Sequence, residues 1–189
     1  MLFRSLDLAV GARVGLIRHG GIEGVLLAGP HLLADQRATD PARRRRAAQV
    51  MEQVGSAQFY RPLLELMADD DPSVASAALQ AAGVVSAPQL WPAMVEALSH
   101  PSQQRAAVAA LARVGDGVLP LLDGLRQRPD AALSARLALV DVFRRLASVG
   151  GDERLVAQLD DSVRGVRERA LRALWQRRHR VPAAQAQRL

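Results

Sequence analysis

The side chains that could ligate a metal ion are a run of three aspartates, Asp69–Asp71, and four histidines. The aspartates lack the alternate spacing and the glycine of a calcium loop. The histidines show no i, i+4 pairing and no nearby carboxylate at a metal-ligand spacing; they are His19, His31, His100 and His179. We therefore expect no metal site, and we expect the aspartates to form a turn that ends in a helix N-cap before Pro72.

The sequence also lacks the residues that usually support covalent catalysis or bind phosphate groups. The sequence has no cysteine, which excludes disulfides, thiolate zinc sites, iron–sulfur clusters and a cysteine nucleophile. It contains no nucleophile elbow, Walker loop or dinucleotide-binding glycine motif. Its glycine pairs, Gly20–Gly21 and Gly150–Gly151, predict turns that end helices. We expect a protein with no catalytic residues and no cofactor.

Positive charge comes entirely from 25 arginines, since lysine is absent. Four of them, Arg43–Arg46, could bind phosphate or anionic lipid headgroups, but consecutive helical residues cover about 400° of arc and cannot form one face. We favour side chains that snorkel at the edge of the fold. Net charge over residues 1–50, 51–100, 101–150 and 151–189 is +4, −5, +3 and +4. The acidic interruption argues against a continuous nucleic-acid groove.

Proline spacing predicts an internal repeat of about 30 residues. Pro41, Pro72, Pro101 and Pro129 stand 31, 29 and 28 residues apart. A second series precedes them by 9 to 11 residues, at Pro30, Pro62, Pro92 and Pro120. When the sequence is shifted by 31 positions, residues 39–67 align with residues 70–98 without a gap. Such spacing is typical of a solenoid, in which each unit repeats one supersecondary motif.

Each unit is expected to be a pair of helices. Ala47, Val50, Met51 and Val54 form an apolar face at i, i+3, i+4 and i+7. This helix should start with Asp40 as N-cap and Pro41 at its first position. Glycines should end the first helices, and a second helix is expected over about 58–68; the glycines are Gly55, Gly83 and Gly115.

These patterns predict an all-α fold, a right-handed α-solenoid of about five helical hairpins. The expected units are 6–38, with a second helix from about Gly29–Pro30, then 39–69, 70–99, 100–128, 129–160 and a partial 161–178. The unit at 129–160 should have an extended first helix through Arg145, and 181–189 should be a polar tail. Residues 1–5 can be encoded by a common sequencing adapter (ATG CTC TTC CGA TCT), so we expect a non-native leader on a fragment.

Residues 72–95 form an uncharged stretch of 24 residues, nominally long enough to span a bilayer. Its serines and glutamines, and the breaks at Gly83, Pro88 and Pro92, favour a helix–turn–helix instead. The start of the chain shows no secretory signal, which favours a cytoplasmic protein.

The repeat resembles HEAT repeats, on D-P-x-V at 71–74, an alanine pair, a glycine, and a short helix opening L-W-P or V-L-P. Its length is similar to the short repeats of phycobilin-lyase-related proteins. The resemblance implies second helices that line a concave binding surface, with no chemistry of their own. The usual Val-Arg is Val74-Ala75 in one unit and Gln103-Gln104 in another, so an Asp–Arg ladder between units is in doubt.

A narrower resemblance rests on F-Y-R-P-L-L at 59–64, G-x-x-V-L-P at 115–120 and R-L-V-A-Q-L-D-D at 154–161. These segments are similar to the cytosolic HEAT segments of bacterial transporters related to nucleotide translocases. The resemblance implies a regulatory segment of a larger membrane protein, on its cytosolic side.

Tyr60 and Trp91 occupy equivalent positions in adjacent units. With Arg61, Glu65 and Glu96 they form our candidate partner-binding strip, because aromatic and arginine side chains are enriched at interface hot spots. Packing of both rings at the start of the second helix is the other interpretation. We expect a non-enzymatic scaffold that binds an unidentified protein, with nucleic acid an improbable partner. The alternatives are the transporter segment and a HEAT-like enzyme such as a bilin lyase or DNA glycosylase.

Overall fold

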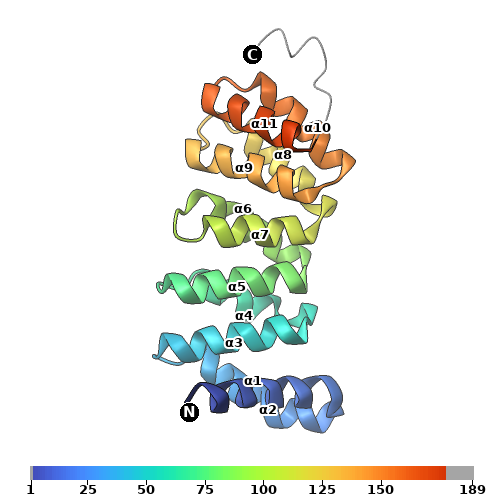
Figure 1. The fold of residues 1–189 in the computed structure, drawn as a ribbon. Helices are drawn as coiled ribbons and strands as arrows, with labels where there is room; N and C mark the ends of the chain where they lie inside the picture. The colour runs from blue at the N-terminus through green and yellow to red at the C-terminus, as the bar shows by residue number, and fades with distance from the viewer. Residues whose placement is uncertain (1, 178–189) are drawn as a thin grey trace. The chain divides into compact units, whose positions relative to one another are not determined.

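A computed structural model describes the chain over residues 2–177, and within that range it contains eleven α-helices and no strand. The predicted all-α fold is thereby confirmed as a HEAT-like succession of helical hairpins (Figure 1). The chain divides into two compact units, one ending at Ala93 and one starting at Met94. The tail expected at 181–189 and the first residue lie outside the described residues, and residues 2–5 begin the first helix.

Five helices build the first unit: α1 (Leu2–His19), α2 (Gly21–Gln36), α3 (Pro41–Val54), α4 (Tyr60–Met67) and α5 (Pro72–Val85). Five build the second unit: α7 (Gln104–Val114), α8 (Leu119–Gln127), α9 (Leu133–Leu146), α10 (Val149–Ala157) and α11 (Arg164–Gln176). The division between the units falls within the short helix α6 (Trp91–Glu96).

The predicted starts of the first helices are confirmed in α3 and α5. The Asp40 carboxylate accepts a hydrogen bond from the Ala42 N–H at 2.9 Å. The Asp71 carboxylate accepts from the N–H groups of Ser73 and Val74, at 2.8 and 3.3 Å. A proline follows each cap, where its missing N–H leaves no bond unmade.

The predicted ends of the first helices are only partly right. Gly55 follows α3 with φ +71°, and Gly115 follows α7 with φ +83°. Gly83 does not end α5, because it lies buried inside that helix. The left-handed residue is Ser86, with φ +51°, which stands 31 residues after Gly55. The repeat period therefore locates this helix end better than glycine content does.

The expectation that Pro30 starts a second helix is wrong. Pro30 lies inside α2, which begins at Gly21, the second residue of the glycine pair that was predicted to form a turn. Gly21 takes φ +58° there, a conformation that glycine adopts without strain. The prediction that Gly150–Gly151 ends a helix is also wrong, because this pair lies in the first turn of α10, where the Ser148 hydroxyl accepts a hydrogen bond from the Gly151 N–H.

The first helix of the 129–160 unit runs through Arg145 as expected, since α9 ends at Leu146. It is not extended, however, because its 14 residues are as many as those of α3 and α5. The uncharged stretch at 72–95 folds as α5, a turn and most of α6, which confirms the helix–turn–helix. Over residues 2–177, no helix has the length and apolar character needed to cross a membrane.

Small side chains dominate the core of the first unit. Helix α5 packs on α3 and α4 (Figure 1). Ala47, Ala48 and Ala78 are 0% exposed, beside the larger side chains of Met51 and Leu79. Alanine lets helix axes approach closely, as the alanine pairs of the sequence predict.

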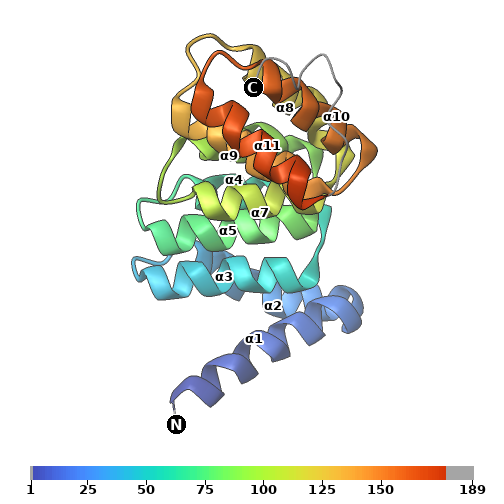
Figure 2. The ribbon, with the colours of Figure 1, turned by 45° about the horizontal axis from the view of Figure 1, so that its top comes forward.

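The second unit has its core around α9. That helix packs against α7, α10 and α11, and Figure 2 shows α11 running across α9. Leu139 and Phe143 of α9 are buried together with Leu155 of α10 and Leu174 of α11.

Candidate interaction surface

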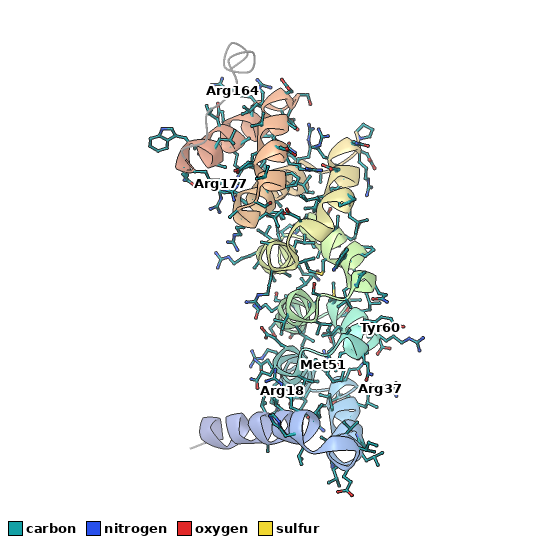
Figure 3. The ribbon with its side chains drawn as sticks, turned by 90° about the vertical axis from the view of Figure 1, so that its right-hand side faces the viewer. Arg18, Arg37, Met51, Tyr60, Arg164 and Arg177 are labelled. Atoms are coloured by element: carbon teal, nitrogen blue, oxygen red, sulfur yellow. The ribbon has the colours of Figure 1, made fainter. Side chains whose placement is uncertain are left out.

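Tyr60 and Trp91 each stand at the first position of a second helix, as their equivalent places in the repeat predict. A three-residue 3-10 turn precedes each of them, Ala57–Phe59 before α4 and Pro88–Leu90 before α6. In Figure 3, Tyr60 lies on the side of the first unit formed by the second helices, away from Met51 in the core. Tyr60 thus lies on the surface where the partner-binding strip was expected.

Tyr60 and Arg61 form a preorganised aromatic–cation pair. The Arg61 Nε donates a hydrogen bond to the Tyr60 hydroxyl at 2.9 Å. The guanidinium carbon lies 5.7 Å from the ring centroid, within the range of a cation–π contact. Arg61 is exposed and Tyr60 half-buried, so both side chains can be reached by a partner.

Trp91 is placed differently from Tyr60. Its side chain is half-buried, and its indole Nε1 is inaccessible and has no hydrogen-bond partner within the described part of the chain. A buried indole N–H normally has a partner. The nitrogen end of the Trp91 ring is thus enclosed without its usual partner, while the residue as a whole is half-buried.

The two glutamates of the strip also differ. Glu65 is exposed, yet its carboxylate accepts a hydrogen bond from Nε2 of Gln36, a side chain in α2 that is only 5% exposed. This bond ties α4 to α2 across two successive hairpins. Glu96 is exposed at the end of α6 and belongs to the second unit. The structure therefore brings Tyr60 and Arg61 together within the first unit.

The arginine run of α3 is divided between ion pairs and solvent. Arg44 donates two parallel hydrogen bonds to the Asp69 carboxylate, from Nε to Oδ2 at 2.6 Å and from Nη2 to Oδ1 at 2.8 Å. Its Nη1 also donates to the carbonyl oxygens of Ala38 and Thr39, each at 2.9 Å. Such bidentate, charge-assisted pairs are the strong ones. For Arg44, the interpretation as a snorkelling residue is wrong.

The same bonds recur in the second unit at equivalent positions. Arg136 donates to Asp161 Oδ1 at 2.6 Å, again 25 residues along the chain. Arg167 donates to the backbone oxygens of Asp161 and Ser162, at 2.8 and 3.1 Å. Gln104 joins the Leu98 and Ser134 carbonyls in the same way. An arginine or glutamine ladder between hairpins thus exists within each unit, although the sequence left it in doubt.

Asp35 is the most enclosed carboxylate of the first unit. Its residue is 3% exposed, and it pairs with Arg13 of α1 and, at 2.6 Å, with Arg43 of α3. Burial alone raises its pKa, but the hydrogen bonds from both guanidinium groups outweigh burial and lower the pKa below its usual value. This charge cluster, which joins three helices, was not predicted. Arg13 stands 22 positions before Asp35 and Arg43 stands 8 positions after it, and no local sequence pattern joins residues at these separations.

Asp69 gives a pH-dependent prediction. The Arg44 hydrogen bonds lower its pKa, so its contribution to stability is complete above the unfolded-state pKa of about 3.9 and is lost as the pH falls through the lower folded-state value. We expect Asp69→Asn to flatten the acid-side loss of unfolding free energy, measured by urea denaturation between about pH 5 and pH 2. Asp70→Asn, at the exposed neighbour, is the control; equal slopes for both variants would contradict the prediction.

Two shallow hollows in the second unit are lined mainly by charged side chains. The larger, about 270 Å³, lies between α9 and α11; its lining is Asp141, Arg144, Arg169, Arg172, Ala173 and Gln176. In it, Arg169 is ion-paired with Asp141 at 3.2 Å. The smaller, about 190 Å³, contains the pair of Arg154 with Asp123 at 2.8 Å. Over residues 2–177, no group of three or more histidine, aspartate or glutamate side chains is arranged to hold a metal ion.

Helical hairpins stacked through small residues, with polar ladders at their turns, define an α-solenoid type of protein. Residues 30–112 match the family of HEAT repeats, which agrees with the resemblance found in the sequence. No curated protein matches the chain.

Proposed function

We propose that this protein is a non-enzymatic scaffold that binds a protein partner on its second-helix surface, with Tyr60 and Arg61 at the contact. The observation that supports the proposal is the Tyr60–Arg61 pair, in which the guanidinium donates a hydrogen bond to the hydroxyl and lies within cation–π range of the ring. Side chains fixed before binding lose less conformational entropy when a partner arrives. Tyrosine and arginine are also enriched among residues that carry binding energy.

The HEAT-like fold supports the same proposal, because HEAT repeats commonly serve as interaction scaffolds. Glu65 lies one turn after Arg61 on α4, and its carboxylate accepts a hydrogen bond from Gln36 of α2. The partner surface that suits this group is a short segment with an acidic side chain for Arg61 and an apolar side chain for the Tyr60 ring. Trp91 would contribute by fixing the start of α6 rather than by direct contact.

The proposal is tested with a phage-displayed peptide library and with affinity capture from lysate, using the whole chain as bait. We expect Tyr60→Ala/Arg61→Ala to lose at least ten-fold in binding to peptides selected on the wild type, while keeping its helical circular dichroism. Arg45→Ala/Gln49→Ala, on the exposed face of α3, is the matched control and should bind as the wild type does.

Equal binding by a folded Tyr60→Ala/Arg61→Ala variant would reject this surface. Trp91→Ala separates the two interpretations of the strip. If Trp91 packs, this variant unfolds more easily and binds the peptides normally below its transition; if Trp91 contacts the partner, binding falls with stability unchanged.

The alternative functions predict other results. A regulatory segment of a membrane transporter predicts membrane-spanning helices in the same gene. A bilin lyase predicts a tetrapyrrole that copurifies with the protein, and a DNA glycosylase predicts salt-sensitive DNA binding.

A further inference from the structure

The hollow between α9 and α11 carries more positive than negative charge. Its volume is about 270 Å³, and three arginines line it against a single carboxylate, that of Asp141. The arginines are Arg144 of α9 and Arg169 and Arg172 of α11. The other lining residues are uncharged, so three positive charges against one negative charge leave a formal charge of +2. Both helices belong to the second unit, and Figure 2 shows them crossing.

Arg144 and Arg169 share the Asp141 carboxylate, and neither is held tightly by it. The Arg144 Nε lies 3.9 Å from Asp141 Oδ1, and the Arg169 Nη2 lies 3.2 Å from Asp141 Oδ2. Within residues 2–177, these are the ion pairs that the two arginines make. A guanidinium group carries a fork of N–H donors that matches the oxygens of a phosphate group, and most of these donors stay unused here.

Arg172 has the most exposed side chain of the three arginines. Its Nη2 lies 3.7 Å from Glu168 Oε2, but Glu168 makes a closer contact with Arg164, at 2.7 Å. Glu168 therefore balances the charge of Arg172 only in part. Trp175 follows Arg172 by three residues on α11, a spacing that makes two residues neighbours on a helix surface, and it is 79% exposed. An aromatic surface thus lies beside the charged hollow.

The smaller hollow of the second unit is different, because its charges balance. Two arginines and two carboxylates line it. Its Arg154 donates to Asp123 Oδ2 from Nε at 3.2 Å and from Nη2 at 2.8 Å. The charged groups of this smaller hollow satisfy one another. The hollow between α9 and α11 has an excess of arginine instead, and its arginines keep unused donors.

We propose that the hollow between α9 and α11 binds a phosphate monoester carried by a phosphorylated segment of a partner protein. Such a group has a charge of about −1.5 to −2 near neutral pH, which the excess charge of the hollow balances. Clusters of arginine suit this ligand because each guanidinium group can bond two phosphate oxygens at once. The inference goes beyond the proposed function, since the Tyr60–Arg61 surface takes no part in it.

The surroundings of the hollow favour a phosphorylated peptide over other sources of phosphate. A free phosphate ion has no use for an aromatic neighbour, whereas a residue next to a phosphorylated one can pack on the exposed Trp175 ring. Membranes and nucleic acids present their phosphates across a wide surface or along a strand. These three arginines converge on one hollow, which suits a single projecting group.

Titration of the full chain with inorganic phosphate, at constant ionic strength, tests the charged part of the site. NMR signals of the arginine Nε–H groups report the binding residue by residue. We expect a dissociation constant on the order of millimolar, and Arg144→Gln to weaken binding about five- to ten-fold. Arg145→Gln is the matched control, because Arg145 also stands in the last turn of α9 but is exposed outside the hollow. Asp141→Asn should tighten binding, because it removes the one negative charge of the lining.

Peptides with a central phosphoserine and randomised flanking residues test the partner. We expect the selected peptides to lose at least about ten-fold in affinity when the phosphate is absent. Trp175→Ala should weaken these phosphopeptides and leave the binding of inorganic phosphate unchanged. Tyr60→Ala/Arg61→Ala should bind them as the wild type does, so a failure of this site is distinguishable from a failure of the proposed scaffold surface.

Several results would overturn the proposal. Equal weakening by Arg144→Gln and Arg145→Gln would mean that inorganic phosphate senses only the general surface charge. Equal binding of phosphorylated and unphosphorylated peptides would remove the role of the phosphate group, and inorganic phosphate that binds as tightly as the best phosphopeptide would make this a site for the free ion. Phosphatidylserine vesicles that bind the wild type but not Arg144→Gln would make the hollow a membrane contact. If Arg144→Gln loses helical circular dichroism, Arg172→Gln, at the most exposed of the three arginines, takes its place in each comparison.

Discussion

Replacing Phe143 by alanine is expected to lower the free energy of unfolding of the second unit by about 3–5 kcal/mol. Phe143 is 0% exposed and is the largest fully buried side chain in the described part of the chain. It stands on α9, the helix against which α7, α10 and α11 all pack, so the cavity left by its ring borders the shared core of the unit. Surrounding helices fixed by several neighbours collapse poorly into such a cavity.

Urea denaturation followed by circular dichroism measures this loss, with hydrogen exchange to assign it to the second unit. Trp175→Ala is the control, because this ring is 79% exposed on α11 and its removal should change stability by less than about 0.5 kcal/mol. A loss below about 1 kcal/mol for Phe143→Ala would show that α9 is not the centre of the core.

The repeat could be predicted from the sequence because its signals are local and recur. Asp40 and Asp71 cap their helices through backbone groups two or three residues away, so the Asp-Pro pairs suffice to predict both helix starts. The predictions that Gly83 ends a helix and that Pro30 starts one were wrong for a related reason. Each is a residue with a strong local preference in isolation, but packing in this fold overrides it, and both lie within helices.

The polar ladder had a signal that was overlooked. Arg44–Asp69 and Arg136–Asp161 are both 25 residues apart, and a comparison of arginine-to-aspartate spacings across units would have paired them. The Asp35 cluster has no such signal, because its three members come from three different helices of one unit.

The sequence predicts where the residues of the candidate surface stand along the helices, but it does not predict how exposed their side chains are. Tyr60 and Trp91 are equivalent in the repeat, and both begin second helices. Whether a ring at that position faces solvent depends on the neighbouring side chains. Tyr60 has Arg61 as its hydrogen-bonded neighbour, whereas the indole nitrogen of Trp91 is enclosed. A repeat pattern specifies the backbone position, and side-chain burial is then set by contacts that differ from unit to unit.

Replacing Gly24 by alanine is expected to destabilise the first unit by about 3 kcal/mol, although alanine is the better helix former. Gly24 is buried where α2 crosses α1. A Cβ atom there would overlap the Leu16 carbonyl oxygen and lie 2.9 Å from the carbonyl carbon. Both atoms belong to the backbone, so neither can rotate away as a side chain does. Relief requires the two helices to separate, which would also loosen the ion pair of Arg13 on α1 with Asp35 on α2.

Gly11→Ala is the matched control, because Gly11 lies inside α1 and a Cβ there meets nothing within 4 Å. We expect it to leave stability unchanged or to raise it by up to about 1 kcal/mol. Thermal unfolding should separate the two variants by roughly 6–12 °C, and hydrogen exchange should show faster exchange in α1 and α2 of Gly24→Ala alone. Equal stability of the two variants would mean that α1 and α2 are not in close contact at Gly24. Because Gly24 lies on α2 and the candidate pair lies on α4, Gly24→Ala should leave the Tyr60–Arg61 surface able to bind at temperatures below its unfolding transition.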